Sequence, residues 1–372
     1  MSGYPRGSEW RQWDLHVHSP ASFFWSGQRF TNGGDGLHDT AIIDSMIEAL
    51  NAAEPAAFAL MDYWTFDGWF ALKRRLAQPG APALTKTVFP GIELRLAAPM
   101  QGRLNAHVIF CDRIDDQLLR NFLTELKLEL LDQPLSQHGL KAYARHVGSD
   151  LLAKHGAKKD EINADDAKAL AIGYKIAELK VDSYKSAVKN VPDGMAIGFM
   201  PFTTNDGLSD VDVMKHYAYA ISLFASSPIF EARDDPTWNA FVGRKTDGNA
   251  KFFDAFQEAL RGVPRLPVSG SDAHQFVGDG TNNARGYGDF PSGRITWIKA
   301  DPSWEGLKQA IREPEKRCHI GTLPPKVALL HKPAAERTSP FPGQTYPATS
   351  VMGVPRAVKP LRTATRIWNS AT

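Results

Sequence analysis

The sequence predicts an α/β fold, either a parallel sheet or a barrel, in which short apolar strands alternate with helices. About seven strand-like runs are separated by segments whose apolar residues recur at helical spacing. Histidine and carboxylate side chains stand at the ends of several of these runs, where α/β barrels collect their catalytic groups. With 372 residues, of which 43% are apolar, the chain has room for one large domain with insertions or for two ordinary domains.

The first predicted strand, within residues 13–19, contains two histidines separated by one residue. Side chains alternate along a strand, so Asp14, His16 and His18 are expected on one face, with Leu15 and Val17 on the other. Two adjacent imidazoles at a strand end form half of a site for zinc, iron or manganese. Taken alone, the pattern is equally compatible with two solvated histidines on an exposed strand.

A second pair of ligand-type residues, Asp272 and His274, follows the apolar run 266–268. Between the two pairs, Glu93 and His107 each lie in a short apolar run of their own. Mixed nitrogen and oxygen ligands of this kind favour a two-metal hydrolytic centre over a cysteine-based structural zinc site. The chain has only two cysteines, so no metal knuckle or disulfide framework is expected.

Charge and hydropathy point to a cytoplasmic protein without a membrane partner. The formal net charge of +2 is too small to argue for nucleic acid by itself. Residues 1–13 lack the apolar stretch of a signal peptide. No apolar run approaches the roughly 20 residues that a membrane span requires.

The remaining elements follow from the same periodicities, taken in chain order. Residues 20–39 predict a loop over the end of the first strand. The alternation of strands and helices is interrupted by a helical insertion at about 115–190, which contains helix-prone stretches at 118–126 and 168–189. The predicted helices are 40–54, 68–76, 211–224, 251–260 and 304–312, and the predicted strands are 56–61, 87–93, 106–111, 195–200, 228–232, 266–269 and 295–298.

Composition divides the chain into a domain at 1–325 and a tail at 326–372. From Arg337 onward there are five prolines, five basic residues, no acidic residue and no periodicity. This composition predicts an irregular tail. A basic tail can contact nucleic acid or an acidic partner, or it can be a solvated end without a function.

The motifs D-L-H-V-H-S at 14–19 and G-S-D-A-H at 270–274 resemble those of the polymerase-and-histidinol-phosphatase (PHP) family of metal-dependent phosphoesterases. The resemblance extends from about Glu9 to Pro325. It implies a distorted seven-strand barrel that binds metal ions and hydrolyses a phosphoester. The ligands implied by the resemblance are His16, His18, Glu93 as the bridging carboxylate, His107, Asp272, His274 and the retained Asp62.

The sequence departs from the family pattern at two places. Tyr63 stands where many members have a histidine, in the T-D-H motif after the second strand. Residues 200–204 read M-P-F-T-T, where the family often has H-P-G. With these two imidazoles absent, the resemblance implies two divalent ions (zinc, manganese or iron) rather than three, or else a decayed site.

A narrower resemblance links residues 7–18 and 296–301 to TrlF-type proteins, in which a PHP domain precedes an SMC-like ATPase. Several relatives of these proteins belong to anti-phage defence systems. The chain contains no G-x-x-x-x-G-K-[ST] pattern. The resemblance therefore implies either a separate ATPase partner chain or a stand-alone version of the domain.

The resulting hypothesis is hydrolysis of a phosphoester, such as a nucleic acid or nucleotide, with one ion activating water and a second bracing an oxygen of the substrate. Glu93 would bridge the ions, Asp14 would orient His16 or His18, and Arg233 would hold a phosphate or form a surface ion pair. The aromatic residues at 23–25 would stack on a base or hold the first loop in place. Two alternatives are an amidohydrolase-type metal hydrolase and a non-catalytic domain that regulates or assembles an ATPase.

Overall fold

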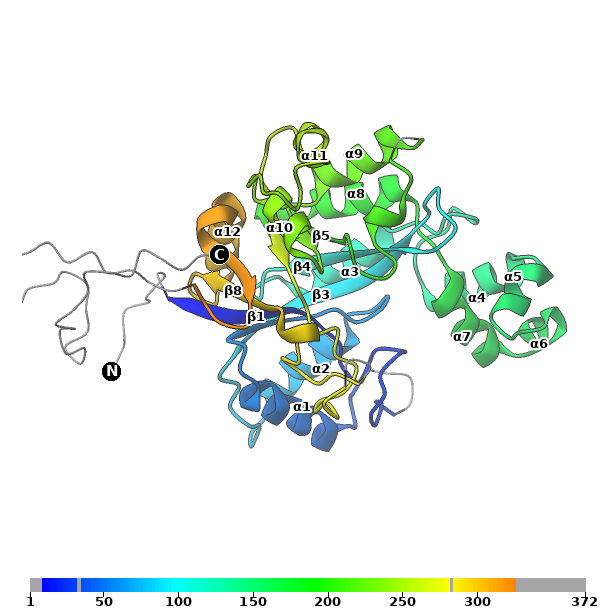
Figure 1. Ribbon diagram of the computed structural model, residues 1–372. Helices are drawn as coiled ribbons and strands as arrows, with labels where there is room; N and C mark the ends of the chain where they lie inside the picture. The colour runs from blue at the N-terminus through cyan, green and yellow to red at the C-terminus, as the bar shows by residue number, and fades with distance from the viewer. Residues whose placement is uncertain (1–8, 32–34, 214, 282–283, 326–372) are drawn as a thin grey trace, which may run out of the picture. The chain divides into compact units, whose positions relative to one another are not determined.

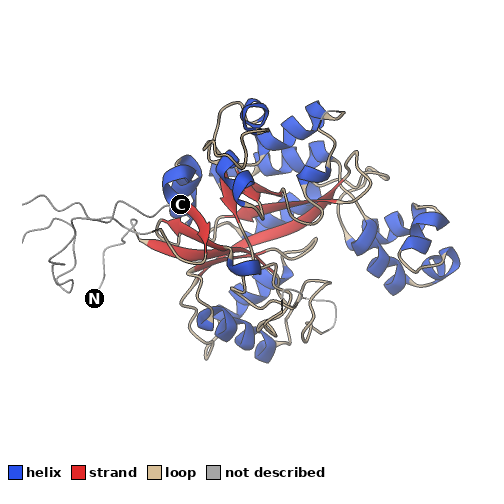
Figure 2. Cartoon of the chain, in the orientation of Figure 1, coloured by secondary structure: helices blue, strands red, loops and turns tan. Residues whose placement is uncertain are grey.

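A nine-stranded mixed sheet forms the centre of the fold, in the strand order β7-β6-β5-β4-β3-β2-β1-β8-β9 (Figures 1 and 2). The computed structural model describes residues 9–31, 35–213, 215–281 and 284–325. All of these residues except Pro325 belong to a compact unit that spans Met1–Pro324. The predicted tail at 326–372 lies outside the described residues. The strands are β1 (Trp10–Val17), β2 (Ala57–Leu60), β3 (Thr87–Leu96), β4 (Leu104–Phe110), β5 (Ala196–Pro201), β6 (Ile229–Glu231), β7 (Leu266–Val268), β8 (Ile295–Lys299) and β9 (Cys318–Gly321).

The sheet curls until the segment after β7 meets β1. Val17 and Ala273 form a parallel bridge, and the His18 amide donates to the Ala273 carbonyl at 2.9 Å. On β8, the Thr296 hydroxyl bonds both the amide and the carbonyl of Ser269, which ties the end of β7 to the strand next to β1. Strands β1–β7 therefore form a nearly closed, distorted barrel, and the predicted α/β barrel is confirmed.

The sheet is not parallel throughout: β8 runs antiparallel to β1 and β9, and β4 also departs from the parallel arrangement. β4 runs antiparallel to both β3 and β5, whereas β1–β2–β3 and β5–β6–β7 are parallel sets. Residues 97–103 alone connect β3 to β4, and a parallel crossover needs roughly a dozen residues or more. A short connection therefore forces a hairpin at this point.

Helices cover the outer faces of the sheet, with α1 (Thr40–Ala52) and α2 (Asp67–Leu76) on one side and α8–α11 on the other (Figure 1). The remaining predicted helices are found, although α9 begins at Tyr217 rather than at 211, because a 3₁₀ turn (Leu208–Asp210) and a turn capped by Asp212 precede it. None of the helices in the described part of the chain combines the length and apolarity needed to span a bilayer. The later helices are α9 (Tyr217–Ser226), α10 (Asp235–Phe241), α11 (Phe253–Ala259), α12 (Trp304–Arg312) and α13 (Pro314–Arg317).

Two apolar clusters fill the space on either side of the strands. The larger one packs α1, α2 and the insertion against the outside of the sheet. The smaller one takes residues from eight strands, such as Phe89, Ile109 and Phe199, and is closed by Trp304 and Leu307 of α12. Because every second strand residue enters it, this smaller cluster is the barrel interior.

The predicted helical insertion is confirmed between β4 and β5. It contains α3 (Asp116–Glu125), α4 (Gln137–His146), α5 (Ser149–Lys154), α6 (Lys159–Ala164), α7 (Asp166–Ile176) and α8 (Val181–Asn190). The single helix-prone stretch at 168–189 is broken into α7 and α8, because Leu179 forms bridges with Leu96 and Leu128. Helices α4–α7 form a group of their own at one side of the sheet (Figure 1).

Arg95 of β3 anchors this insertion to the barrel. Its side chain is 1% exposed, and one guanidinium nitrogen donates to the carbonyls of Tyr174 and Lys175 at the end of α7. The Trp64 indole donates to the same Tyr174 carbonyl at 3.1 Å. A buried cation thus pairs with carbonyl groups that the helix itself leaves without partners.

We expect Arg95→Met to loosen the insertion without unfolding the barrel. The substitution keeps the apolar stem but leaves two buried carbonyls without their charged donor, which costs about 2 kcal/mol. Hydrogen exchange should therefore quicken in α7 and much less in β1–β3. Arg244→Met, which removes an exposed arginine bonded to Asn239 outside the insertion, serves as the control. Equal protection of α7 in both variants would contradict the anchoring role.

Candidate metal centre

A β-bulge in β1 sets the direction of the two histidines. The register of β1 against β2 shifts between Asp14 and Val17. As a result Leu15 lies in the barrel interior, whereas Val17 packs in the outer cluster. The expectation that these two residues share a face, opposite the histidines, is therefore wrong. The extra residue of the bulge turns His16 and His18 inward, at the end of the apolar interior.

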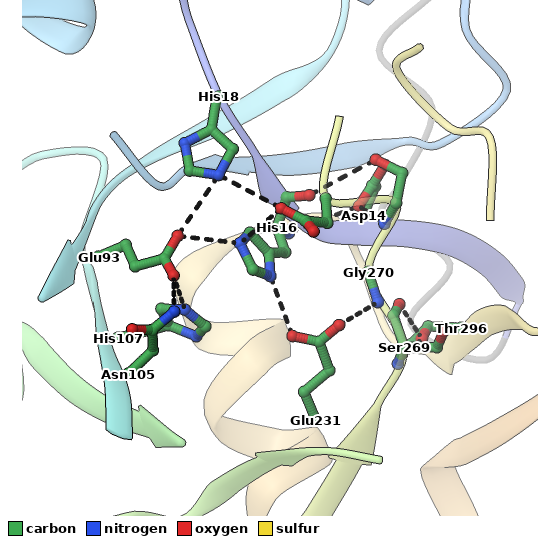
Figure 3. A network of polar contacts seen from close by, with 12 residues as sticks. Asp14, His16, His18, Glu93, Asn105, His107, Glu231, Ser269, Gly270 and Thr296 are labelled. Carbon is green, nitrogen blue, oxygen red and sulfur yellow. Dashed lines mark hydrogen bonds and ion pairs between the residues drawn. The ribbon is translucent and has the colours of Figure 1, made fainter. Parts of the chain in front are cut away.

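Glu93 and His107 meet because β3 and β4 are antiparallel. They are direct cross-strand partners, and both share the interior face with Phe89 and Ile109. One oxygen of Glu93 lies 3.5 Å from Nε2 of His107 and accepts a 2.6 Å hydrogen bond from the Asn105 amide. The other oxygen lies 3.4 Å from Nε2 of both His16 and His18 (Figure 3). A single carboxylate thus stands among three imidazoles.

Asp272 and His274 complete the cluster from the segment after β7. Asp272 has a positive φ of 53°, and its Oδ1 lies 3.5 Å from Nε2 of His16 and of His18 and 3.3 Å from Nε2 of His274. The rings of His18 and His274 stack at 4.1 Å. Three overlapping groups could each hold a cation: His16 with His18 and Glu93, His18 with Asp272 and His274, and His16 with His107 and Glu231.

The residues present fit metal ions. Both ring nitrogens of His18 and of His107, and Nδ1 of His274, are buried and make no hydrogen bond. Imidazole nitrogens left without partners in a buried site are costly unless something binds them. Four histidines with Glu93, Glu231 and Asp272 form the nitrogen and oxygen donor set that zinc, manganese and iron accept.

Burial and charge keep His18 neutral and keep Glu93, Glu231 and Asp272 ionised, and the carboxylates in turn stabilise the protonated form of His16 in the metal-free cluster. Burial, together with the neighbouring His274, lowers the pKa of His18 to about 3, so this ring is neutral. Burial alone would raise the pKa of Glu93, but the imidazoles of His107 and His16 outweigh burial and lower it. For His16, burial has the opposite sign and would lower the pKa, but the negative charges of Glu231 and Asp272 outweigh burial and hold the pKa of His16 well above its usual value. The carboxylates are therefore ionised, as metal ligands must be.

Asp14 and Asp62 stand beside the cluster rather than in it. Asp14 accepts hydrogen bonds from the amides of Ser271 and Gly288, both at 3.0 Å, and does not contact a ring nitrogen of His16 or His18 in the described structure. Asp62 belongs to none of the three cation groups, because Ser19 donates its amide and its hydroxyl to the two carboxylate oxygens at 2.7 and 2.5 Å. Both aspartates fix loops that carry the ligands.

The two departures from the expected histidine pattern lie at the site itself. Tyr63 is 8% exposed, and its ring stacks parallel on His18 at 5.1 Å. Burial, together with the charges of Glu93 and Asp272, raises the pKa of Tyr63 well above 10, so its phenol is neutral. Pro201 and Thr204 line the same small cavity of about 150 Å³, and the Thr204 hydroxyl makes no hydrogen bond.

Glu231, at the end of β6, was not among the predicted site residues. Its Oε2 lies 2.9 Å from Nδ1 of His16, and its Oε1 accepts from the Gly270 amide at 3.3 Å. It shares the interior face with Ile229, two residues earlier. A carboxylate beside a short apolar run, the signal that indicated Glu93, is also present here and could have identified Glu231.

We expect Glu231→Gln to weaken metal binding by roughly 10- to 100-fold, because the glutamate orients and polarises His16. The amide keeps the shape of the side chain but removes its charge. The apparent dissociation constant for manganese or zinc, measured by competition with a chromogenic chelator, would report the change. Glu178→Gln, a carboxylate of the insertion, is the control, and an unchanged constant in Glu231→Gln would remove Glu231 from the site.

A larger cavity of about 440 Å³ opens next to the cluster and carries positive charge. Asp272 and His274 line its floor, and three arginines line its walls: Arg233, Arg285 and Arg294. Arg285 is held in place by the Ser271 carbonyl and by Asp272 at 3.4 Å. The predicted ion pair of Arg233 with Asp234 or Asp235 is not formed in the described structure; its guanidinium lies 3.5 Å from the Asn205 amide oxygen instead.

The fold and the site together define an α/β barrel protein with a buried histidine–carboxylate cluster of the kind that holds metal ions. No family model matches the sequence, and no curated protein matches it. Among solved structures, the chain is similar to an amidohydrolase from Chromobacterium violaceum, determined with bound sulfate and no metal, at 15% identity and a TM-score of 0.36 over 80% of this chain and 96% of that one. It is also similar to the lesion-specific endonuclease PfuEndoQ from Pyrococcus furiosus, at 12% identity and a TM-score of 0.41 over 84% of this chain and 58% of that one.

Proposed function

We propose that this protein is a metal-dependent phosphoesterase. The observation that carries the proposal is the juxtaposition of three cation-binding groups with an arginine-lined cavity, joined through Asp272 and His274. A phosphoester is an anion whose reacting phosphorus must approach the metal ions while its charge is neutralised. Neutral amide or lactam substrates would not need three arginines at the entrance, so the phosphoester is favoured over an amidohydrolase substrate.

Different residues of the cluster and of the arginine-lined cavity would hold the metal ions and bind the phosphoester. When bound, two divalent ions would lower the pKa of a water molecule and offset charge on the phosphoryl group. Glu93, held by Asn105, lies where it could bridge the ligand groups, and Glu231 orients His16. Arg233 and Arg294 present forked donors to the non-reacting phosphoryl oxygens. Tyr63, as a neutral phenol, can donate a hydrogen bond into the site.

The finer part of the proposal is that the substrate is a nucleic acid or a nucleotide and that the protein acts with a separate SMC-like ATPase in anti-phage defence. This part is supported by the sequence resemblance to PHP domains of TrlF-type proteins. It predicts that an SMC-like ATPase binds this protein.

A specific observation supports a second candidate, a domain without catalysis that regulates such an ATPase. Tyr63 and the segment containing Thr204 occupy places where related proteins often have histidine. If these losses removed a required ion, the remaining cluster would stabilise the fold only. The ring nitrogens of His18 and His107 are buried and make no hydrogen bond, so they are available to bind metal ions, which favours the enzyme over the regulatory domain.

Elemental analysis of protein purified without chelator would test the proposal. We expect about two equivalents of a transition metal, and we expect His16→Ala/His18→Ala to lose it together with hydrolysis of bis-(p-nitrophenyl) phosphate, single-stranded DNA, RNA or nucleotides. His138→Ala/His146→Ala, two exposed histidines of α4, is the matched control. Protein without metal after incubation with manganese and zinc would refute the hydrolase. Bound metal without turnover of any of these esters would favour the regulatory domain.

A further inference from the structure

A third cavity, of about 460 Å³, lies between the first loop, the segment after β2 and the helical insertion. Its volume falls within the roughly 300–1,000 Å³ of small-molecule pockets. Tyr63 lines both this cavity and the small cavity of the metal cluster. The ring of Tyr63, which stacks on His18, therefore forms part of the boundary between the two cavities. A group covalently attached to a phosphoester at the cluster could therefore extend past this ring into the third cavity.

The wall of this cavity is built from flat rings. Phe23 stacks parallel on Tyr174 at 5.3 Å, and Phe30 and Trp64 complete an aromatic surface. Flat side chains that line a cavity favour a planar ring as the ligand, because a ring can stack on them with its whole face.

Polar groups stand at the rim of the same cavity. Thr65 and Gln137 bring side chains that can accept and donate hydrogen bonds, and Arg29 is exposed beside them. Arg29 forms no ion pair with the described residues; its guanidinium donates to the Ser22 carbonyl at 2.7 Å. An apolar wall with an amide, a hydroxyl and a cation at the edge suits a heterocycle, whose faces stack while its edge forms hydrogen bonds.

The wall is held rigidly relative to the metal cluster. Arg95, two residues from Glu93 on β3, bonds the Tyr174 carbonyl at 3.0 Å, and its guanidinium lies 5.9 Å from the centre of the Phe23 ring and 5.5 Å from that of Tyr63. The same strand therefore positions a metal ligand and, through Arg95, the aromatic wall. Such pre-organisation lowers the entropic cost of binding a ligand that spans both places.

We propose that this cavity, which we call the ring pocket and which is lined by Phe23, Phe30, Trp64, Leu170 and Tyr174, binds the nucleobase of a phosphoester whose phosphate lies at the metal cluster. The inference rests on the proposed phosphoesterase function and narrows its substrate to nucleotide units. A free nucleotide and a single-stranded nucleic acid would present the same base to the ring pocket. Leu170 of α7, which is half-buried, lines the ring pocket from the helical insertion.

Calorimetric titration of the full chain with adenosine 5′-monophosphate and with ribose 5-phosphate would test the ring pocket, with and without manganese. Loss of a stacked base typically weakens binding by roughly 10-fold or more, so we expect the nucleotide to bind at least that much more tightly. Leu170→Trp, which fills the pocket, and Phe23→Leu, which removes a stacking ring, should bring this ratio close to one. Leu131→Trp, a half-buried leucine of the insertion that does not line the pocket, should leave it unchanged.

The outcomes separate this inference from the function on which it rests. Equal affinities for the two ligands in the wild type, or an unaltered ratio in both Leu170→Trp and Phe23→Leu, would overturn the ring pocket. Preferential nucleotide binding without hydrolysis would uphold the ring pocket while counting against the phosphoesterase. A four-nucleotide single-stranded DNA that binds more tightly than the mononucleotide would identify nucleic acid as the source of the base, and the reverse order would identify a free nucleotide.

Discussion

Glu93→Gln is expected to abolish most of the hydrolytic activity while leaving the fold intact. Glu93 is 1% exposed and lies within 3.5 Å of a ring nitrogen of each of His16, His18 and His107. The amide has the same shape and can still accept the hydrogen bond from Asn105. It removes the negative charge on which two cations would rely, so kcat/KM should fall by at least about 100-fold.

Metal content and kcat/KM, measured together, check this expectation. Asp39→Asn is the matched control, because Asp39 is also buried (7% exposed) but bonds Thr31 in the first loop, away from the cluster. The control should retain both metal and activity. A Glu93→Gln protein with full metal content and unchanged kcat/KM would show that the centre of the cluster lies elsewhere, around Asp272 or Glu231.

The residues of the cluster could be selected from the sequence because each carries its signal locally. A histidine or carboxylate next to a short apolar run marks the end of a buried strand, and His16, His18, Glu93, His107 and the pair Asp272/His274 all do so. The structure brings all six together. Most helices and strands follow the same logic, since their periodicity is a property of a few adjacent residues.

The features that the sequence did not predict depend on contacts between distant segments. The bulge in β1 arises from its register with β2 and from the return of the segment after β7, neither of which leaves a mark in residues 14–17. The same long-range contacts divert Asp14 and Asp62 to backbone and serine partners. Glu231 also follows a short apolar run, but β6 has only three residues, too few for the alternation of interior and exterior side chains to show which face Glu231 lies on. The ring pocket is likewise made by a loop and an insertion far apart in sequence.

Gly270→Ala tests whether the meeting of β1 with the segment after β7 builds the site. A Cβ atom at position 270 would lie 2.4 Å from Cβ of His16 and 3.4 Å from its Cα. The backbone of His16 is held by the bulge and by the hydrogen bond from the Asp272 amide, so it cannot yield without moving a ligand. We expect the free energy of unfolding of the metal-free protein to fall by about 2 kcal/mol.

Because the added methyl group displaces His16 itself, metal should be lost as well as stability, which distinguishes this change from ordinary overpacking of the core. Chemical unfolding in the presence of a chelator gives the first quantity, and elemental analysis gives the second. Gly148→Ala is the control, since a Cβ there meets no atom within 4 Å and its φ of −71° suits any residue. A Gly270→Ala protein that keeps its metal would mean that His16 can shift without leaving the cluster, and the cation would then depend on His18, Asp272 and His274.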